Sequence, residues 1–390
     1  MDKDKTIALI VPYIGGGGAE RVAADLSIYF SSRNYQVLFF VQCHLSDAEA
    51  YPHEGMQIEI PMQYISQGDN VGKAITVLFK EARMLKQLKK KYGVDISISF
   101  MQPANILNIL SRYHDKIIVT VHNVVSKRKD MLPNIYHNKW VYKYLYQMAD
   151  HIVLVSKYCR NDWIRHYNDL FHKTRIIYNP VREIGNMEKR LRGNIILFLA
   201  RFDGIKRPWH IIRMFSRVLE MVPDARLLML GDGLLLQPMR ELAGAMNLED
   251  SVSFAGYVDN VGKYLQTAKV LVVASDSESF SCSAVEAMQN GVPVVANDCP
   301  GGIREVLGVK KDLIMPGIRK AQCGLITPFL DGKRYSASDE LSAEEKLMAD
   351  AVVMLLRDEE LYGRCSRNCR KRAEAFGLER IGFIWEELIN

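Results

Sequence analysis

Short apolar runs alternate with amphipathic stretches of helical length along most of this chain, and this alternation limits the fold more than any other feature. The runs are nearly continuous in Ile, Val, Leu and Phe, as expected for parallel strands that helices cover on both faces. In the first half they lie at 6–11, 37–41, 95–100, 116–121 and 151–155. Helical stretches accompany them at 19–33, 73–92, 103–112, 139–148 and 157–167.

The pattern restarts after a turn at Asn179 and Pro180 and a polar segment, 182–194. New apolar runs follow at 195–200, 226–230, 252–254, 270–274 and 292–296, with helical stretches at 208–221, 237–246 and 283–290. Two successive blocks of alternating strands and helices predict two α/β domains, which we place at 1–185 and 186–370. The final segment, 371–390, is expected to be a helix whose apolar stripe packs on another part of the chain.

Cysteine content and hydropathy indicate the compartment. No run approaches the ~20 apolar residues that cross a bilayer. The N-terminus also lacks a signal-peptide pattern. The seven cysteines are scattered, and no His completes a zinc set. We therefore expect a cytoplasmic protein with reduced thiols.

Positive charge is concentrated in the first half of the chain. Residues 1–185 hold 24 Lys and Arg against 17 Asp and Glu, a net charge of +7, whereas the remainder, with 27 against 28, carries −1. A basic amphipathic helix is typical of contact with an anionic membrane surface, and the alternative is a solvated face opposite the core. No nucleic-acid recognition motif accompanies the charge, so we expect no nucleic-acid partner. The cations of the expected helix 73–92 include Lys80, Arg83, Lys86, Lys89, Lys90 and Lys91.

A glycine run, 15–18, follows the first strand and opens a helix. Gly16 and Gly17 would let the backbone approach a ligand closely at a helix N-terminus, which favours an anion. The alternative is a flexible turn. The run does not fit the dinucleotide fingerprint, because Glu20 occupies the third glycine position and no acidic residue ends the second strand. These departures argue against a nicotinamide-dependent oxidoreductase.

Two cations follow the first strand of the second block. Arg201 and Lys206 lie just before a helix that Pro208 starts, and cations at the carboxyl end of a parallel strand suit a diphosphate. A solvated basic loop is the alternative. Gly231 and Gly233 end the next strand, where glycines allow a flat group such as a nucleobase to lie against the backbone.

Acidic residues and a histidine complete the candidate chemistry. Glu278 and Glu286 lie eight residues apart, and a carboxylate near a helix N-terminus suits ribose hydroxyls, although Ser283 and Glu286 also spell a capping box. Asp276 and Glu278 superficially resemble a metal-binding pair, but no third ligand is visible, so we expect no metal. His122 ends a strand, where it would hydrogen-bond a substrate hydroxyl, relay a proton or serve the structure alone.

Together these segments resemble the large retaining glycosyltransferase family 4, over nearly the whole chain. The resemblance implies the GT-B fold, with two facing Rossmann-like domains, a deep cleft between them and a C-terminal helix that crosses back to the N-terminal domain. Six elements match in the family's order: Gly-Gly-Ala-Glu-Arg at 17–21, Asn179-Pro180, Arg201 with Lys206, Gly231-Asp-Gly233, Glu278 with Glu286, and Gly-Val-Pro-Val at 291–294.

The resemblance also implies roles. Arg201 and Lys206 would grip the donor diphosphate, Glu286 the ribose, and Glu278 the transferred sugar. His122 resembles the family's histidine at the sugar 6-hydroxyl. Backbone N–H groups of the segment Phe280, Ser281, Cys282 and Ser283 would bind the sugar and β-phosphate, and the loop with Gly16 and Gly17 would close over the donor.

One departure concerns the donor sugar. The family often has Gly-Leu-Val or Pro-Leu-Val after the phenylalanine, whereas Ser281-Cys282-Ser283 stands here. Cys299-Pro-Gly-Gly is similar to a variant in bacterial surface-polysaccharide enzymes.

The resemblance implies sugar transfer from a nucleotide-sugar, favouring UDP, to a glycan or polyprenyl-linked acceptor at the inner face of the cell membrane, without a cofactor. A nucleotide-sugar epimerase and a non-catalytic nucleotide-sugar-binding partner are the alternatives.

Overall fold

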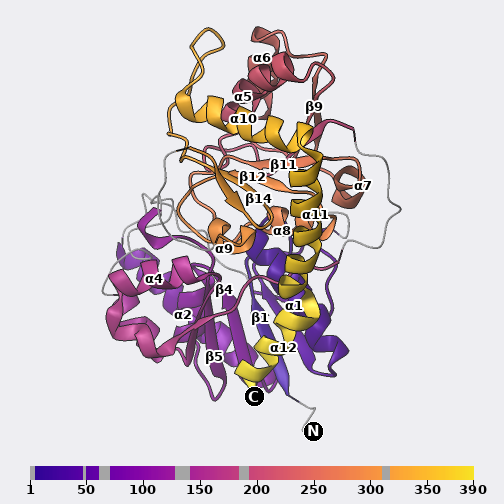
Figure 1. Ribbon diagram of the computed structural model, residues 1–390. Helices are drawn as coiled ribbons and strands as arrows, with labels where there is room; N and C mark the ends of the chain where they lie inside the picture. Colours follow the sequence, from indigo (N-terminus) through magenta and orange to yellow (C-terminus); the bar gives the residue numbers. More distant parts are fainter. Residues whose placement is uncertain (1–4, 47–49, 61–70, 128–140, 184–192, 310–316) are drawn as a thin grey trace. The chain divides into compact units, whose positions relative to one another are not determined.

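The computed structural model describes residues 5–46, 50–60, 71–127, 141–183, 193–309 and 317–390. The chain divides into two compact units, which are described separately below. The first contains 1–182 together with 377–390, and the second contains 183–376. The N-terminal and C-terminal segments therefore belong to the same unit (Figure 1).

The first unit is built on a parallel sheet of seven strands in the order β3-β2-β1-β4-β5-β6-β7. The strands are β1 (Thr6–Ile10), β2 (Gln36–Val41), β3 (Met56–Glu59), β4 (Ile96–Phe100), β5 (Lys116–Val121), β6 (His151–Leu154) and β7 (Thr174–Ile176). The helices are α1 (Gly18–Ser32), α2 (Val71–Lys91), α3 (Ala104–Leu110), α4 (Lys157–His166) and α12 (Leu378–Ile389).

Helices cover both faces of this sheet. Successive residues of a strand point to opposite faces, so Ile7 and Leu9 of β1 pack with α1 and α12, whereas Ala8 and Ile10 pack with α2 and α3. All five residues of β1 are buried. This double coverage explains the continuous apolar runs from which the sequence predicted parallel strands.

The C-terminal helix α12 packs on α1 within the first unit. The Tyr29 hydroxyl donates to Glu386 Oε2 at 3.0 Å, and Trp385 is 2 % exposed. A side chain at Gly382 would lie 2.4 Å from the Tyr29 ring, so only glycine allows the helices to approach this closely. The returning helix begins at Leu378, whereas residues 371–376 belong to the second unit.

The second unit contains a seven-stranded sheet in the order β10-β9-β8-β11-β12-β14-β13, parallel except for β13, which runs antiparallel to β14. The strands are β8 (Ile195–Leu199), β9 (Arg226–Leu230), β10 (Val252–Gly256), β11 (Val270–Val273), β12 (Val294–Asn297), β13 (Arg319–Ala321) and β14 (Gly324–Thr327). The helices are α5 (Pro208–Met221), α6 (Leu236–Ala245), α7 (Val261–Leu265), α8 (Cys282–Gln289), α9 (Ile303–Leu307), α10 (Ala343–Arg357) and α11 (Glu359–Ala373).

Several short helices and strands were not predicted from the sequence. β3, β7, β13, β14, α7 and α9 have three to five residues each, and β3 is partly exposed along its length, so no continuous apolar run marks it. Part of the expected helix at 139–148 lies outside the described residues. Its remainder forms a π-helical turn, Val141–Leu145, and a 3-10 turn, Tyr146–Met148.

Candidate functional site

The carboxyl ends of β8 and β11 form the switch point of the second sheet, because β9 and β10 continue on one side and β12 and β14 on the other. Ligands of open α/β sheets bind in the crevice at such a point. Two predicted site residues meet there. Lys206, in the loop after β8, places Nζ 2.5 Å from Oε1 of Glu278, in the loop after β11.

The surroundings of this ion pair keep the Lys206 ammonium charged. Glu278 is 7 % exposed, and the Ser275 hydroxyl donates to the same Oε1 atom at 2.7 Å. Burial alone would lower the pKa of Lys206, but the charge and hydrogen bond of Glu278 outweigh it, and the pKa is raised. Lys206 therefore presents a fixed positive charge at the switch point.

The backbone of Glu278 is held by the segment after β12. Its N–H donates to Pro300 O at 3.0 Å, and its carbonyl accepts from Gly302 N at 2.7 Å. A side chain at Gly301, which has φ +132°, would lie 1.9 Å from Glu278 O, so this contact requires glycine. Burial and the Glu278 charge also raise the pKa of the Cys299 thiol, which stays neutral. The Cys-Pro-Gly-Gly segment thus has a structural role, which is to hold the backbone of Glu278.

Each carboxylate of the supposed metal-binding pair faces a cation. Asp276 pairs with the Arg207 guanidinium, as Glu278 pairs with Lys206. Within the described ranges, no group of three or more His, Cys, Asp or Glu is arranged to hold a metal ion.

Arg201 lies at the same sheet edge but is less firmly held. Its side chain is 64 % exposed, and Nη2 lies 3.3 Å from Oδ2 of Asp203. The other Asp203 oxygen accepts from the backbone N–H groups of Ile205 and Lys206, both at 2.9 Å. Asp203 thus shapes the loop that carries both predicted cations.

Gly231 and Gly233 have a packing reason that the sequence did not indicate. A side chain at Gly231 would lie 2.0 Å from Ala200 O, and one at Gly233 would lie 2.6 Å from Phe202 O. Both glycines have positive φ, +125° and +147°. The structure therefore gives both glycines a packing reason, the close contact between the loops after β8 and β9.

The helix α8 starts earlier than the capping-box interpretation requires. Its N-cap is Ser281, with no side-chain capping bond, so Ser283 lies inside the first turn and that interpretation is wrong. Ser281 has left-handed backbone angles, φ 78° and ψ 78°, which favour glycine. Its hydroxyl is buried without a hydrogen-bond partner among the described residues. The serine that replaces the family's glycine or proline is thus strained.

Two further predicted residues flank this turn from the buried side. Phe280 is 2 % exposed and packs edge-to-face on Phe376, with ring centroids 5.2 Å apart. Glu286 lies in the second turn of α8 and is 3 % exposed. Cys282, the first helical residue, is partly exposed.

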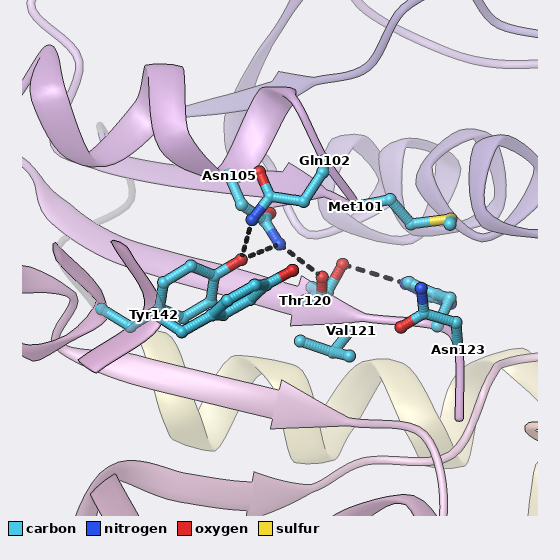
Figure 2. Close-up of a pocket in the computed structure, with 9 residues that line it drawn as sticks. Met101, Gln102, Asn105, Thr120, Val121, Asn123 and Tyr142 are labelled. Atoms are coloured by element: carbon cyan, nitrogen blue, oxygen red, sulfur yellow. Dashed lines mark hydrogen bonds between the residues drawn. The ribbon is translucent and has the colours of Figure 1, made fainter. Parts of the chain in front are cut away.

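His122 lies in the first unit, at the end of β5, beside a polar recess (Figure 2). Thr120 Oγ1 donates to Ser99 O and lies 2.9 Å from His122 Nε2, so it accepts a hydrogen bond from this ring nitrogen. Nδ1 is then an acceptor, buried without a partner in the described part of the chain. Burial lowers the His122 pKa to about 4, and the ring is neutral at pH 7. The recess is also lined by Met101, Gln102, Asn105, Val121, Asn123, Tyr142 and Tyr146.

The glycine run of the first unit begins α1. Gly17 is its N-cap, without a side-chain capping bond, and Gly16 is exposed with φ +71°. A side chain at Gly17 would lie 2.2 Å from Glu20 Oε2. His122, Gly16 and Gly17 thus belong to the first unit, and the other predicted site residues belong to the second.

Two family models match successive parts of the chain. Glycosyltransferase Family 4 matches residues 16–183, and Glycosyl transferases group 1 matches residues 183–328. Together they cover every strand of the two sheets except β1. The chain is a GT-B glycosyltransferase.

Several proteins resemble this glycosyltransferase in sequence. An uncharacterized glycosyltransferase of Methanocaldococcus jannaschii is 31 % identical over 268 residues, which span 64 % of this chain and 65 % of that protein. The chain is also 25 % identical over 312 residues to a Campylobacter jejuni protein, covering 77 % of this chain and 83 % of the relative. Its name is N-acetylgalactosamine-N,N'-diacetylbacillosaminyl-diphospho-undecaprenol 4-alpha-N-acetylgalactosaminyltransferase.

Solved structures confirm the predicted GT-B fold. Anabaena HepE, crystallised with UDP and glucose, has a TM-score of 0.73 at 16 % identity and covers 98 % of both chains.

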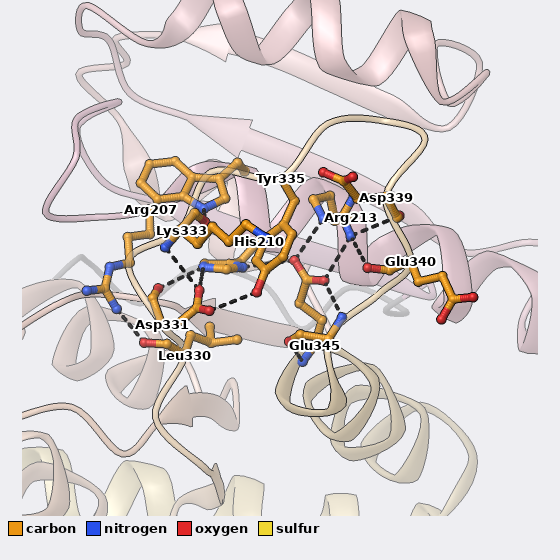
Figure 3. Close-up of polar contacts among 12 residues, drawn as sticks. Arg207, His210, Arg213, Leu330, Asp331, Lys333, Tyr335, Asp339, Glu340 and Glu345 are labelled. Atoms are coloured by element: carbon orange, nitrogen blue, oxygen red, sulfur yellow. Dashed lines mark hydrogen bonds and ion pairs between the residues drawn. The ribbon is translucent and has the colours of Figure 1, made fainter.

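Several residues of the glycosyltransferase site escaped the sequence analysis. Ser275 donates to Glu278, Asp203 organises the loop of Arg201 and Lys206, and Arg207 pairs with Asp276 and donates to the Leu330 carbonyl, the second contact being visible in Figure 3. Ser275 and Asp203 act through hydrogen bonds within their own loops, and Arg207 acts through a contact with a loop 69 residues away, so no short motif marks them. For Arg207, its left-handed backbone before Pro208 is visible only in the structure.

The basic helix α2 of the glycosyltransferase differs from the expectation at one residue. Lys89 is fully buried, and its Nζ lies 2.7 Å from Asp115 Oδ2 and 2.6 Å from Asn108 Oδ1. It therefore cannot contact a membrane. The other cations of this helix, Lys73, Lys80, Arg83, Lys86, Lys90 and Lys91, are exposed. None of the described helices is both long and apolar enough to span a membrane.

Proposed function

We propose that the chain is a retaining glycosyltransferase that moves a sugar from a UDP-sugar to a lipid-linked glycan acceptor in cell-surface polysaccharide biosynthesis. The observation that carries the proposal is the Lys206–Glu278 ion pair at the switch point of the second sheet. It supplies a fixed cation where α/β sheets bind ligands and a carboxylate beside it. Arg201 adds a second, exposed cation at the same edge.

These charges suit the chemistry of sugar transfer. As the bond between C1 of the sugar and the β-phosphate oxygen breaks, negative charge grows on the diphosphate, and Arg201 and Lys206 stabilise it without a metal ion. The acceptor oxygen bonds to C1 on the same face, and its proton passes to a β-phosphate oxygen. The configuration at C1 is retained, and UDP is released.

The remaining predicted residues of the second unit take roles around the same donor. Glu278 positions the transferred sugar, Glu286 binds the ribose, and the backbone from Phe280 to Ser283 binds the β-phosphate near the N-terminus of α8. Gly231 and Gly233 shape the donor edge through the neighbouring loop. In the first unit, His122 Nδ1 is proposed to accept a hydrogen bond from a substrate hydroxyl, and the turn with Gly16 and Gly17, at the N-terminus of α1, to bind an anionic group.

The acceptor class is supported by the Campylobacter jejuni relative, whose name contains a diphospho-undecaprenol acceptor. The decisive experiment offers UDP-glucose, UDP-galactose, UDP-N-acetylglucosamine and UDP-N-acetylgalactosamine with a polyprenyl-diphosphate-linked sugar. We expect UDP release that requires the acceptor and an α-linked product in the proton NMR spectrum. A β-linked product would contradict retention. Interconversion of UDP-sugars without an acceptor would indicate an epimerase, and UDP-sugar binding without any transfer would indicate a non-catalytic partner.

The exposed face of α2 supports a peripheral membrane role. Its six exposed cations surround two exposed apolar side chains, Ile75 and Phe79, which are 39 % and 59 % exposed. The one acidic residue of the helix, Glu81, is buried, so this face carries positive charge alone. Each cation near an anionic bilayer contributes about 1 kcal/mol, and the apolar side chains insert at the interface.

Vesicle flotation tests this face. We expect the chain to float with phosphatidylglycerol vesicles at low salt and to remain below phosphatidylcholine vesicles. A variant in which Lys80, Arg83 and Lys86 become Glu should stay unbound. The control changes three exposed cations of α11, Arg364, Arg367 and Lys371, to Glu and should still float. Equal loss in both variants would show that net charge, and not α2, drives binding.

A further inference from the structure

Arg207 follows Lys206 directly and has an unusual backbone. Its φ of 47° and ψ of 54° lie in the left-handed region, which is unfavourable for a residue other than glycine. Such a conformation persists when surrounding contacts enforce it. It lets the chain turn sharply between Lys206 and the first residue of α5, so that adjacent side chains serve two different contacts.

The Arg207 side chain joins three loops at the carboxyl edge of the second sheet. It is 6 % exposed and pairs with Asp276, in the loop after β11. Nη1 donates to Leu330 O at 2.5 Å, in the segment after β14, and the guanidinium lies 4.9 Å from the centre of the Phe329 ring. Because the guanidinium is buried in these contacts, it acts on a substrate only through its neighbours.

Two contacts, one hydrogen bond and one ion pair, therefore flank the Lys206–Glu278 ion pair. On one side, Asp276 N donates to Ile205 O at 2.7 Å. On the other, Arg207 pairs with the Asp276 side chain. Lys206 lies between the two tied residues, and Glu278 lies two residues beyond Asp276. A flexible lysine side chain loses rotamer entropy when it is fixed. Because the residues on both sides of Lys206 are held in place, its side chain is directed towards Glu278.

The segment that follows Leu330, whose carbonyl accepts from Arg207, is itself held in place. His210 and Arg213 follow it at three-residue intervals along α5, on the same helical face, and hold the segment 331–340 (Figure 3). His210 Nε2 contacts Asp331 O at 3.0 Å, and Arg213 Nη2 donates to Glu340 O at 2.8 Å. Both also bind the fully buried Glu345 of α10. The Leu330 carbonyl, which accepts from Arg207, thus directly precedes a fixed segment.

We propose that Arg207 is a positioning residue, which holds Lys206 against Glu278 by pinning the loops after β8, β11 and β14 together. This proposal rests on the proposed function, in which Lys206 stabilises the leaving diphosphate. Misplacing a charged group by a fraction of an ångström mainly weakens transition-state stabilisation, so kcat should fall more than UDP binding.

The test uses the full chain and a cycle of variants: Arg207→Met, Lys206→Met and their combination. Turnover is followed as UDP release from whichever of the four UDP-sugars named above is used fastest, and binding is measured by titration with UDP. Arg207→Lys tests rescue by a conservative change. The matched control is Arg217→Met, on the same helix α5, where Arg217 pairs with Asp350 at 2.9 Å.

We expect Arg207→Met to lower kcat 10- to 100-fold. Its dissociation constant for UDP should change less than threefold. Arg207→Lys should recover part of the loss, and Arg217→Met should stay within twofold of the unaltered chain. Once Lys206 is Met, adding Arg207→Met should lower kcat by less than threefold, because the charge that Arg207 positions is already gone.

Other outcomes separate the two proposals. If the unaltered chain releases UDP from none of the four sugars, or Lys206→Met is fully active, the proposed function of the site fails. If Lys206→Met is impaired but the two losses multiply in the double variant, Arg207 acts independently and the positioning proposal is overturned. Should Arg207→Met not fold, Asp276→Asn replaces it in the same cycle, with the same expected lack of additivity.

Discussion

The protonation of His122 can be tested without any substrate. Its ordinary pKa of 6.5 is lowered to about 4 because the ring is buried. Between these pH values the unfolded chain binds a proton that the folded chain does not. The resulting stabilisation is complete above pH 6.5 and is lost as the pH falls through 6.5 towards 4. The gap corresponds to about 3 kcal/mol of unfolding free energy in the first unit.

The perturbation is His122→Asn, which keeps an N–H donor for Thr120 but does not titrate. Denaturant unfolding at pH 7.5 and pH 4.5 is followed by hydrogen exchange in peptides from β4 and β5, so that the first unit is observed separately. Most of the expected loss, about 2.5 kcal/mol, should occur by pH 4.5 in the unaltered chain and be missing in the variant. Other groups titrate equally in both chains and cancel.

Nitrogen NMR of ring-labelled histidine gives an independent measurement. The signal missing from the His122→Asn spectrum belongs to His122 among the nine histidines. At pH 7 it should show the neutral tautomer protonated at Nε2, since Thr120 Oγ1 already donates to Ser99 O. Titration near 6.5, or a proton on Nδ1, would refute the assigned hydrogen-bond chain and with it the role of Nδ1 as an acceptor.

Three further substitutions test the donor edge. Arg201→Ala should lower turnover about 100- to 1000-fold, with unchanged thermal stability because the side chain is 64 % exposed; near-normal turnover would remove Arg201 from the mechanism. Gly231→Ala should destabilise the second unit by more than about 3 kcal/mol in urea unfolding, whereas Gly204→Ala, with nothing within 4 Å, should change it by less than about 1 kcal/mol. Ser281→Gly should stabilise the same unit by about 0.5–1 kcal/mol, because it relieves a left-handed backbone and removes an unpaired hydroxyl.

The two-block α/β architecture could be predicted because its signal is local. Each buried parallel strand is an apolar run, and each helix has its own period, so β8, β9 and β11 were found within about two residues of their observed ends. The prediction that Lys89 belongs to the basic face of α2 was wrong because it followed the charge of the residue and not its helical position. Lys89 follows Leu78, Ala82 and Leu85 at the helical spacing of the buried face, and Asp115 and Asn108 of other elements enclose it.

The site could be predicted only in part. The rule that ligands bind at the carboxyl ends of parallel strands brought Lys206 and Glu278, 72 residues apart, to one sheet edge, where they are in contact. The rule did not indicate which neighbouring residues hold Lys206 and Glu278 in place. Ser275, Asp203 and Arg207 are ordinary loop residues in the sequence, and their roles depend on loop conformations that no periodic pattern encodes.

The glycines at this edge mark contacts between loops, and this affects how the site works. Gly231 lets the loop after β9 touch the carbonyl of Ala200, just before Arg201, and Gly301 lets the segment after β12 touch the carbonyl of Glu278. Backbone packing therefore sets the positions of the charged groups before any ligand arrives. A charge fixed in this way needs little reorganisation as the diphosphate departs, which is the condition for strong electrostatic stabilisation of a transition state. Gly231 and Gly301 would then be required for the placement of Arg201 and Glu278, even if neither glycine touches the donor.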